Sequence, residues 1–195
     1  MPLRVRRSIR EKNSHPDNST GIKVLRCENL FGERVDMTNE EMLVNSVVSS
    51  WKIVIGRLDK GIQQLGEEQL QRQVAPGKNR LYYLVGHLTA VHDRMFLLLG
   101  LGERLYPQLD EPYVTNPDGT LPDPMSADEL KSAWSEVNAK LTAAVQALTA
   151  EQWLQKHTQV SDEDFAKDPS RNRLAVFLSR TNHASFHAGQ AVLVK

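Results

Sequence analysis

The C-terminal part of the chain carries two histidines at a spacing that suits metal binding. His183 and His187 lie four residues apart in a stretch without proline, and this stretch predicts a helix. At ~100° per residue, positions i and i+4 are only ~40° apart around a helix, so both imidazoles leave from one face. Neutral imidazole is a ligand for zinc, nickel, copper and iron. The pair therefore predicts two ligands of one metal ion.

A third ligand must come from elsewhere, because two histidines alone bind a metal weakly and bundle sites take further ligands from a facing helix. The candidates carry imidazole or carboxylate groups: His87, His92, Asp93, His157 and the carboxylates near Asp162. His87 and His92 cannot both join from one helix, since five residues separate them by ~140° around its axis. His92 lies nearer the apolar arc, so the helical periodicity does not favour His87.

Four amphipathic segments are expected to position these side chains. In each of them apolar residues recur every three or four positions, which is typical of a helix with one buried face. The predicted helices cover about 39–65, 79–99, 127–148 and 170 to near the C-terminus. Apolar residues lie on several sides of the last of these helices, so we expect it to be central in the fold.

Local signals support these helices and their connections. Capping boxes predict two of the starts, Thr38 with Glu41 and Ser126 with Glu129. Shorter helices are expected to begin near Thr149 and Ser161. Five prolines between positions 107 and 124 predict a long crossover connection between the second and third long helices. Four long helices without a convincing strand alternation predict an all-α fold, a four-helix bundle.

The first 36 residues differ from the rest of the chain. They are rich in arginine, asparagine, serine and glycine and show weak periodicity, with a strand-like run only at 22–25. We therefore interpret 1–36 as an N-terminal extension and 37–195 as the bundle domain. Cys27 is the single cysteine, so no intrachain disulfide can form, which fits a reducing compartment.

Composition argues against several kinds of partner. Lys and Arg together number 24, as do Asp and Glu, so the near-zero net charge gives no electrostatic reason to expect nucleic acid or an anionic membrane as a partner. The basic start between Arg4 and Lys12 lacks interleaved aromatic residues, and we interpret it as a solvated tail. No apolar run approaches the ~20 residues of a membrane span, and no apolar segment of a secretory signal follows the basic start. We expect a cytoplasmic protein.

Two short motifs resemble those of the DinB/YfiT-like family. Val85-Gly86-His87-Leu88 is similar to the family's Gly-His-Leu signature, and the stretch from His183 to Gln190 resembles its closing His-x-x-x-His-x-Gly-Gln. The similarity covers roughly 38–195, including the helix order and the crossover. It implies a four-helix bundle, often a homodimer, in which His87, His183 and His187 hold one divalent metal ion. Zinc and nickel are the metals we expect, and the sequence does not choose between them.

The resemblance also implies a class of chemistry. Family members studied as enzymes are thiol S-transferases or isomerases that use a low-molecular-weight thiol such as mycothiol, bacillithiol or glutathione, so we expect a small-molecule substrate. A non-catalytic, stress-related metal-binding dimer and a metal-dependent hydrolase are the alternatives. No general base can be identified in the sequence.

Two further residues of the last helix are candidates for binding the cosubstrate. Arg180 lies one turn before the histidine pair and could hold a carboxylate of a thiol cofactor or form a surface salt bridge. Gln190 could form a hydrogen bond near the site or stabilise a helix contact. Gly189 is expected to permit close helix packing.

Overall fold

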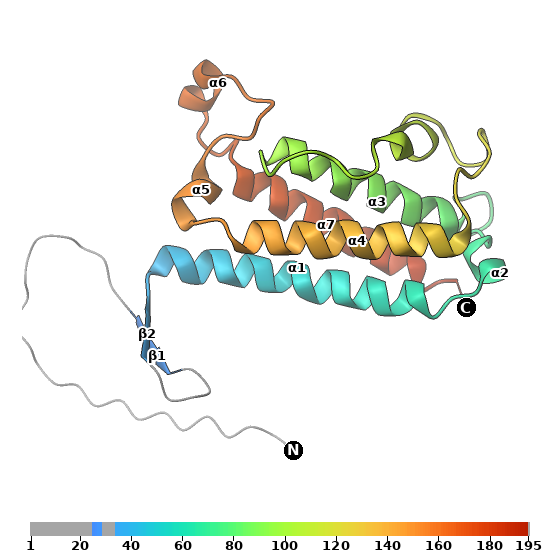
Figure 1. The fold of residues 1–195 in the computed structure, drawn as a ribbon, viewed down its shortest axis with the longest axis horizontal. Coiled ribbons are helices and arrows are strands. Elements are labelled where there is room, and N and C mark those ends of the chain that lie inside the picture. The colour runs from blue at the N-terminus through green and yellow to red at the C-terminus, as the bar shows by residue number, and fades with distance from the viewer. Residues whose placement is uncertain (1–24, 29–33, 195) are drawn as a thin grey trace, which may run out of the picture. The chain divides into compact units, whose positions relative to one another are not determined.

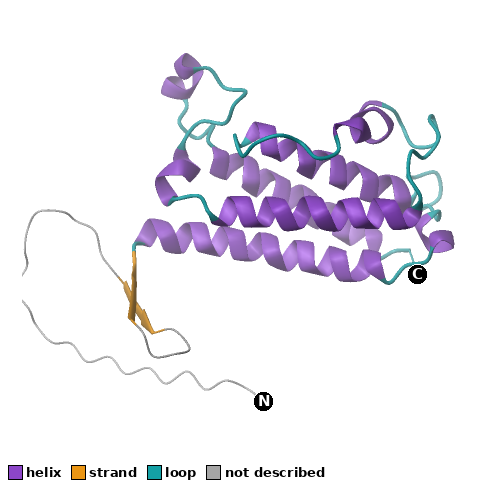
Figure 2. Cartoon of the chain, in the orientation of Figure 1, coloured by secondary structure: helices purple, strands orange, loops and turns teal. Residues whose placement is uncertain are grey.

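The computed structural model describes residues 25–28 and 34–194 of the 195-residue chain, in two compact units, 1–39 and 40–195 (Figure 2). In the first unit, β1 (Leu25–Glu28) pairs antiparallel with β2 (Arg34–Met37), with Cys27 opposite Val35. The strand expected at 22–25 is described only from Leu25 onward, and the basic start lies outside the described residues.

The second unit is helical, as the sequence predicts. Its four long helices are α1 (Asn39–Gln63), α3 (Leu81–Leu98), α4 (Ala127–Gln146) and α7 (Arg173–Ala191). The short helices are α2 (Glu67–Leu70), η1 (Pro107–Leu109), η2 (Glu111–Thr115), α5 (Ala150–Leu154) and α6 (Asp162–Lys167). α5 and α6 begin where they were expected, whereas α2, η1 and η2 were not predicted. Among the described residues, no helix combines the length and the hydropathy that a membrane span requires.

Capping explains where α4 begins. The hydroxyl of Ser126 accepts the backbone N–H of Glu129, and the Glu129 carboxylate accepts the backbone N–H of Ser126 at 2.7 Å. This reciprocal pair satisfies two donors that the first turn of a helix leaves open. A glycine marks where α3 ends. Gly100, just beyond the helix, adopts a φ of 65°, a left-handed conformation that stops the helix at little steric cost.

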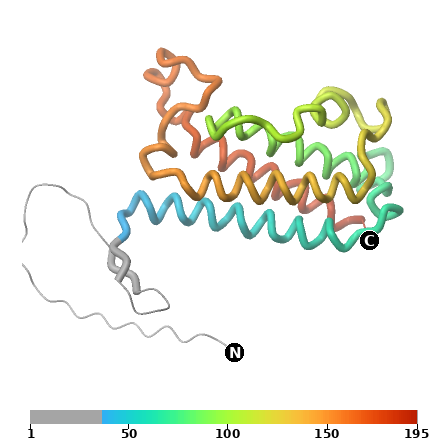
Figure 3. The backbone as a smooth tube through the Cα atoms, in the orientation of Figure 1, coloured from blue at the N-terminus to red at the C-terminus, as the bar shows by residue number. Residues whose placement is uncertain are grey.

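The long crossover follows from the directions of the helices (Figures 1 and 3). α3 and α4 run parallel: the Tyr82 hydroxyl donates to the Met125 carbonyl at their starts, and His92 bonds Asn138 farther along at 2.8 Å. The chain must therefore return over the whole length of α3 before α4 can begin. η1 and η2 form this return path and both pack on α3.

Hydrogen bonds to the buried carboxylate of Asp93 hold the start of the crossover in place. Asp93 is fully buried and accepts the Nε–H of Arg104 at 2.9 Å together with the backbone N–H groups of Leu105 and Tyr106 at 2.7 and 3.1 Å. The sequence offered Asp93 as a candidate metal ligand, whereas the structure places its carboxylate in these hydrogen bonds and outside the histidine cluster. Its position on α3 lies under the returning chain, which the periodicity of α3 alone does not show.

α3, not α7, is the central helix. Fourteen of its residues are buried, because α4, α7, η1 and η2 all pack against it. α7 has only three buried residues, Phe177, Thr181 and Ala184, and Phe186 on its outer side is 63% exposed. The expectation that the last helix is central was therefore wrong: some of its apolar side chains face solvent.

Candidate metal centre

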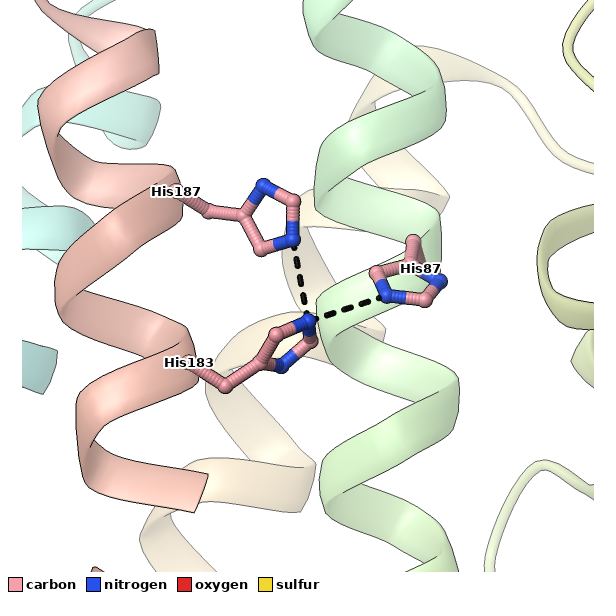
Figure 4. A group of neighbouring side chains, drawn as sticks. All are labelled: His87, His183 and His187. Carbon is pink, nitrogen blue, oxygen red and sulfur yellow. Dashed lines mark hydrogen bonds between the residues drawn. The ribbon is translucent and has the colours of Figure 1, made fainter. Parts of the chain in front are cut away.

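Three imidazoles from two helices converge on one point (Figure 4). α3 supplies His87, and α7 supplies His183 and His187 from successive turns. The Nε2 atom of His183 lies 3.3 Å from Nε2 of His87 and 3.0 Å from Nε2 of His187. The three rings stand at 71° to 85° to one another, so they meet edge to face rather than stacking. All three side chains are half-buried.

The outer nitrogens of two rings have partners that set their tautomers. Nδ1 of His87 lies 2.8 Å from the backbone carbonyl of Tyr113, and Nδ1 of His187 lies 2.7 Å from Oε1 of Gln190. Both oxygens are acceptors, so each ring carries its proton on Nδ1 and leaves the Nε2 lone pair free. A carbonyl behind a histidine is the usual partner that orients a metal ligand.

A glycine makes the first of these hydrogen bonds possible. A Cβ atom at Gly86 would lie 2.6 Å from Cγ of Tyr113, so the tyrosine ring occupies the space that a side chain would need. This close approach brings η2 onto α3 and places the Tyr113 carbonyl against the next residue, His87. The Gly-His pair in the sequence therefore has a physical reason: the glycine admits the segment that orients the histidine.

The three ligand atoms lie within 4.8 Å of one another, and the spacings of His183 Nε2 from its two neighbours suit ligands of one metal ion. Two nitrogens bound to one tetrahedral zinc at about 2.0–2.1 Å lie about 3.3 Å apart, close to the two spacings here. Without a cation, Nε2 of His183 faces the Nε2 lone pairs of both His87 and His187. A single N–H at this atom can donate to only one of the two. Nδ1 of His183 is buried without a partner among the described residues. The donor set of three imidazole nitrogens suits a divalent transition-metal ion, for which imidazole is a good ligand.

The surroundings keep the three imidazoles neutral. Burial lowers the pKa of His87, His183 and His187, and for His183, with help from the neighbouring His187 and His87, to about 4. The charge of Arg180 also lowers the pKa of His87 and His183. Since only the neutral ring binds a metal, the cluster is ready to do so at neutral pH.

The other candidate ligands lie elsewhere. His92 is fully buried between Trp51 and Trp134, with ring centroids 4.8 and 5.6 Å away, and is a core residue. His157 lies in a separate pocket, and the carboxylate of Asp162 pairs with Lys156 at 2.9 Å. Within residues 25–28 and 34–194, the three histidines are the only cluster of three or more such groups.

The remaining predicted residues of α7 have distinct positions. Gln190 holds the ring of His187, a contact on which the sequence left two interpretations open. Arg180 is half-buried and has no salt bridge or hydrogen bond in the part of the chain that the structure describes. Gly189 meets nothing within 4 Å of an added Cβ, so the expectation that it permits close packing was wrong. Tyr113 and the role of Gly86 were missed, since a backbone carbonyl leaves no signal in a sequence.

Comparisons with known proteins agree with this architecture. The profile described as the DinB superfamily matches residues 51–191, which include all three histidines. A crystal structure described as the conserved protein of locus from Enterococcus faecalis has a similar fold, with a TM-score of 0.54 and 18% sequence identity. The similarity covers 78% of this chain and 96% of that one. No curated protein matches the chain.

Proposed function

Because the chain belongs to the DinB superfamily, and because three neutral imidazoles converge between α3 and α7, we propose that it is a metal-dependent enzyme acting on a small molecule. His87, His183 and His187 would hold one divalent cation, zinc or nickel. The convergence of the three Nε2 atoms is the observation that carries this proposal. A cation with three protein ligands keeps positions for water or substrate, the arrangement of catalytic rather than structural zinc sites.

The reaction we propose is transfer of a low-molecular-weight thiol to an electrophile, or a thiol-dependent isomerisation. A bound divalent cation lowers the pKa of a thiol or a water molecule towards neutrality. In the transfer, the thiol proton leaves to solvent, the sulfur forms a bond to the electrophilic carbon, and the leaving group departs with its bonding electrons. Solvent is the proton acceptor because no carboxylate belongs to the described cluster.

The protein residues would contribute positioning. The Tyr113 carbonyl and the Gln190 side chain fix two ligand rings from outside, so the Nε2 atoms stay directed at one point. Half-burial limits the water that competes with a substrate and keeps the rings unprotonated. The resemblance also leads us to propose a homodimer, which analytical ultracentrifugation of the purified protein would test.

The test is a paired activity screen. Protein reconstituted with zinc or nickel is assayed with 1-chloro-2,4-dinitrobenzene and each of several thiols, and separately with p-nitrophenyl acetate without thiol. We expect thiol-dependent turnover that is lost when His87, His183 and His187 are all changed to alanine. Ester hydrolysis without thiol would favour the hydrolase instead. No turnover in either assay by fully metal-loaded protein would favour the non-catalytic metal protein.

A further inference from the structure

Arg180 is a charged side chain without a counter-ion. It is half-buried on α7, and burial lowers the pKa of its guanidinium, with Arg94 as a second cause. The neighbouring Arg94, by contrast, has a carboxylate partner: Asp110 accepts an N–H of Arg94 at 2.9 Å and one of Arg104 at 2.6 Å. Partial desolvation of a guanidinium, which has five N–H donors, costs free energy unless an anion accepts its hydrogen bonds and balances its charge.

Arg180 lines a pocket that is suited to an anion. This pocket has a volume of about 380 Å³ and lies between the end of α3, the loops around α6 and the first half of α7. None of its lining residues is an aspartate or a glutamate, and most of the lining residues are of polar types: His157, Gln159, Ser170, Arg171, Asn172 and Ser179. An anion entering it would therefore meet donors and no carboxylate of the lining.

The pocket offers about one positive charge rather than several. Arg171 is a second cation in the lining, but it lies 3.7 Å from the Asp164 carboxylate, which offsets its charge. Burial and Arg171 lower the pKa of His157, so this ring is neutral at neutral pH. Arg180 remains as the unpaired cation, which favours a monoanion such as a carboxylate over a phosphate dianion.

Arg180 also lies next to the metal centre. It precedes His183 by three residues on α7, which is a rise of ~4.5 Å along the helix axis and a turn of ~60°. α3 runs beside this part of α7: the charge of Arg94 on α3 lowers the pKa of Arg180, and the charge of Arg180 lowers the pKa of His87. Arg180, which lines the pocket, thus lies about one helical turn from His183, a spacing that one small molecule can span.

We propose that Arg180 and the pocket that it lines form a carboxylate subsite for the substrate or thiol cosubstrate whose reacting atom lies at the three histidines. This inference rests on the proposed function and adds the class of ligand: a small molecule with a carboxylate at one end and the reacting thiol several bonds away. The guanidinium fork matches the two oxygens of a carboxylate.

The test uses matched thiols and a metal whose thiolate complex absorbs light. Cobalt-substituted protein is titrated with 3-mercaptopropionate and 6-mercaptohexanoate, and with their neutral counterparts 3-mercaptopropanol and 6-mercaptohexanol. The sulfur-to-cobalt absorption band reports binding. We expect at least one acid to bind about tenfold more tightly than its matched alcohol, and Arg180→Met to abolish that preference while the alcohols bind as before.

Two controls make the outcomes separable. Arg57→Met removes an exposed arginine that lines a different groove, between α1 and the last part of α7, and should leave the preference unchanged. Butyrate is also titrated into metal-free protein while the Nε–H resonance of Arg180 is followed by NMR; a saturable shift is expected. If no thiol gives the cobalt band, the thiol chemistry fails and the butyrate titration still decides the subsite. Equal binding of acids and alcohols, or a preference that survives Arg180→Met, would overturn the subsite.

Discussion

At His87 and His187, the hydrogen bond on one ring nitrogen determines what the other nitrogen can do. A carbonyl behind each ring keeps the proton on Nδ1, so both Nε2 lone pairs are available at once. His183 stands between them and shares its single Nε2 with both neighbours. A cation would replace this unsatisfied arrangement with three good bonds.

The Gly86→Ala change tests whether the orienting carbonyl matters. The added methyl group would collide with the Tyr113 ring, push η2 away and lengthen the bond from His87 to the Tyr113 carbonyl. Loss of such an outer partner typically weakens metal binding by about 10- to 100-fold. Competition with a chelator of known affinity for zinc measures this change.

Gly189→Ala is the matched control, since the new methyl group meets nothing within 4 Å. It should bind zinc as the wild type does. Equal affinity in Gly86→Ala and Gly189→Ala would show that the Tyr113 carbonyl does not orient the ligand.

The sequence shows part of the triad and not all of it. The spacing of His183 and His187 is enough to put them on one face, because both lie on the same helix. His87 could be chosen over His92 only through the resemblance, because α3 is buried on nearly every side and its periodicity does not point to one partner. The unpaired state of Arg180 depends on which carboxylates other segments bring near, and no local pattern encodes that.

α3 is the element that connects the core, the crossover and the metal centre. One side carries His87, another buries His92 against two tryptophans, and a third holds Asp93 under the returning chain. Helix starts were predictable because capping is local, as at Ser126. The short turns η1 and η2 were not, since contacts with α3 and the Asp93 carboxylate fix the crossover.

The buried His92 should make the stability of metal-free protein depend on pH. Burial lowers the pKa of His92 from 6.5 to about 3, so the folded state keeps it neutral while the unfolded chain takes up a proton below about pH 6.5. Its contribution to the free energy of unfolding is therefore present above that pH and is lost as the pH falls. Between pH 7 and 5 the loss from this one group is about 2 kcal/mol.

Urea unfolding at both pH values measures this effect. His92→Gln keeps an amide group for Asn138 and removes the titration, so its free energy of unfolding should fall by about 2 kcal/mol less than that of the wild type. If the free energy of unfolding falls by the same amount in both proteins between pH 7 and 5, His92 does not stay neutral in the folded state.

Asp93→Asn should loosen the crossover. The substitution keeps the shape of the side chain but removes the charge that accepts three hydrogen bonds in a fully buried position. Because bonds to a buried charge are the stronger kind, we expect a loss of roughly 2–3 kcal/mol in the free energy of unfolding by urea.

Glu163→Gln is the control for the loss of one negative charge. Its partner is the exposed Lys167, so the free energy of unfolding should change by less than about 0.5 kcal/mol. Asp93→Asn protein as stable as Glu163→Gln protein would contradict the role given to Asp93.

For the whole molecule, the three-histidine cluster connects segments that are distant in sequence. His87 and His183 lie 96 positions apart, and a cation between them would bridge α3 and α7 only in the folded chain. The all-α bundle and its crossover could be predicted because local sequence patterns indicate the four helices, and a run of prolines indicates the crossover. The burial of α3 on nearly every side could not be predicted, because it depends on how many other segments pack against this helix.

A ligand that binds only the folded state raises stability by mass action. Zinc at about 1,000 times its dissociation constant should add about 4 kcal/mol, which corresponds to a rise of roughly 8–16 °C in the Tm of a chain of this size. Differential scanning calorimetry with and without zinc tests this rise. The His87, His183 and His187 triple alanine protein should show no rise, and an equal rise there would place the zinc elsewhere.

The most direct test of the central claim is the metal content of the protein, measured by elemental analysis after reconstitution and removal of unbound ions. The account predicts about one zinc or nickel ion per chain in the wild type and in His157→Ala, whose ring lies outside the cluster. It predicts none in His183→Ala, where the ring that contacts both other histidines is gone. A folded His183→Ala protein that still holds one ion per chain, or a wild type that takes up none, would contradict it.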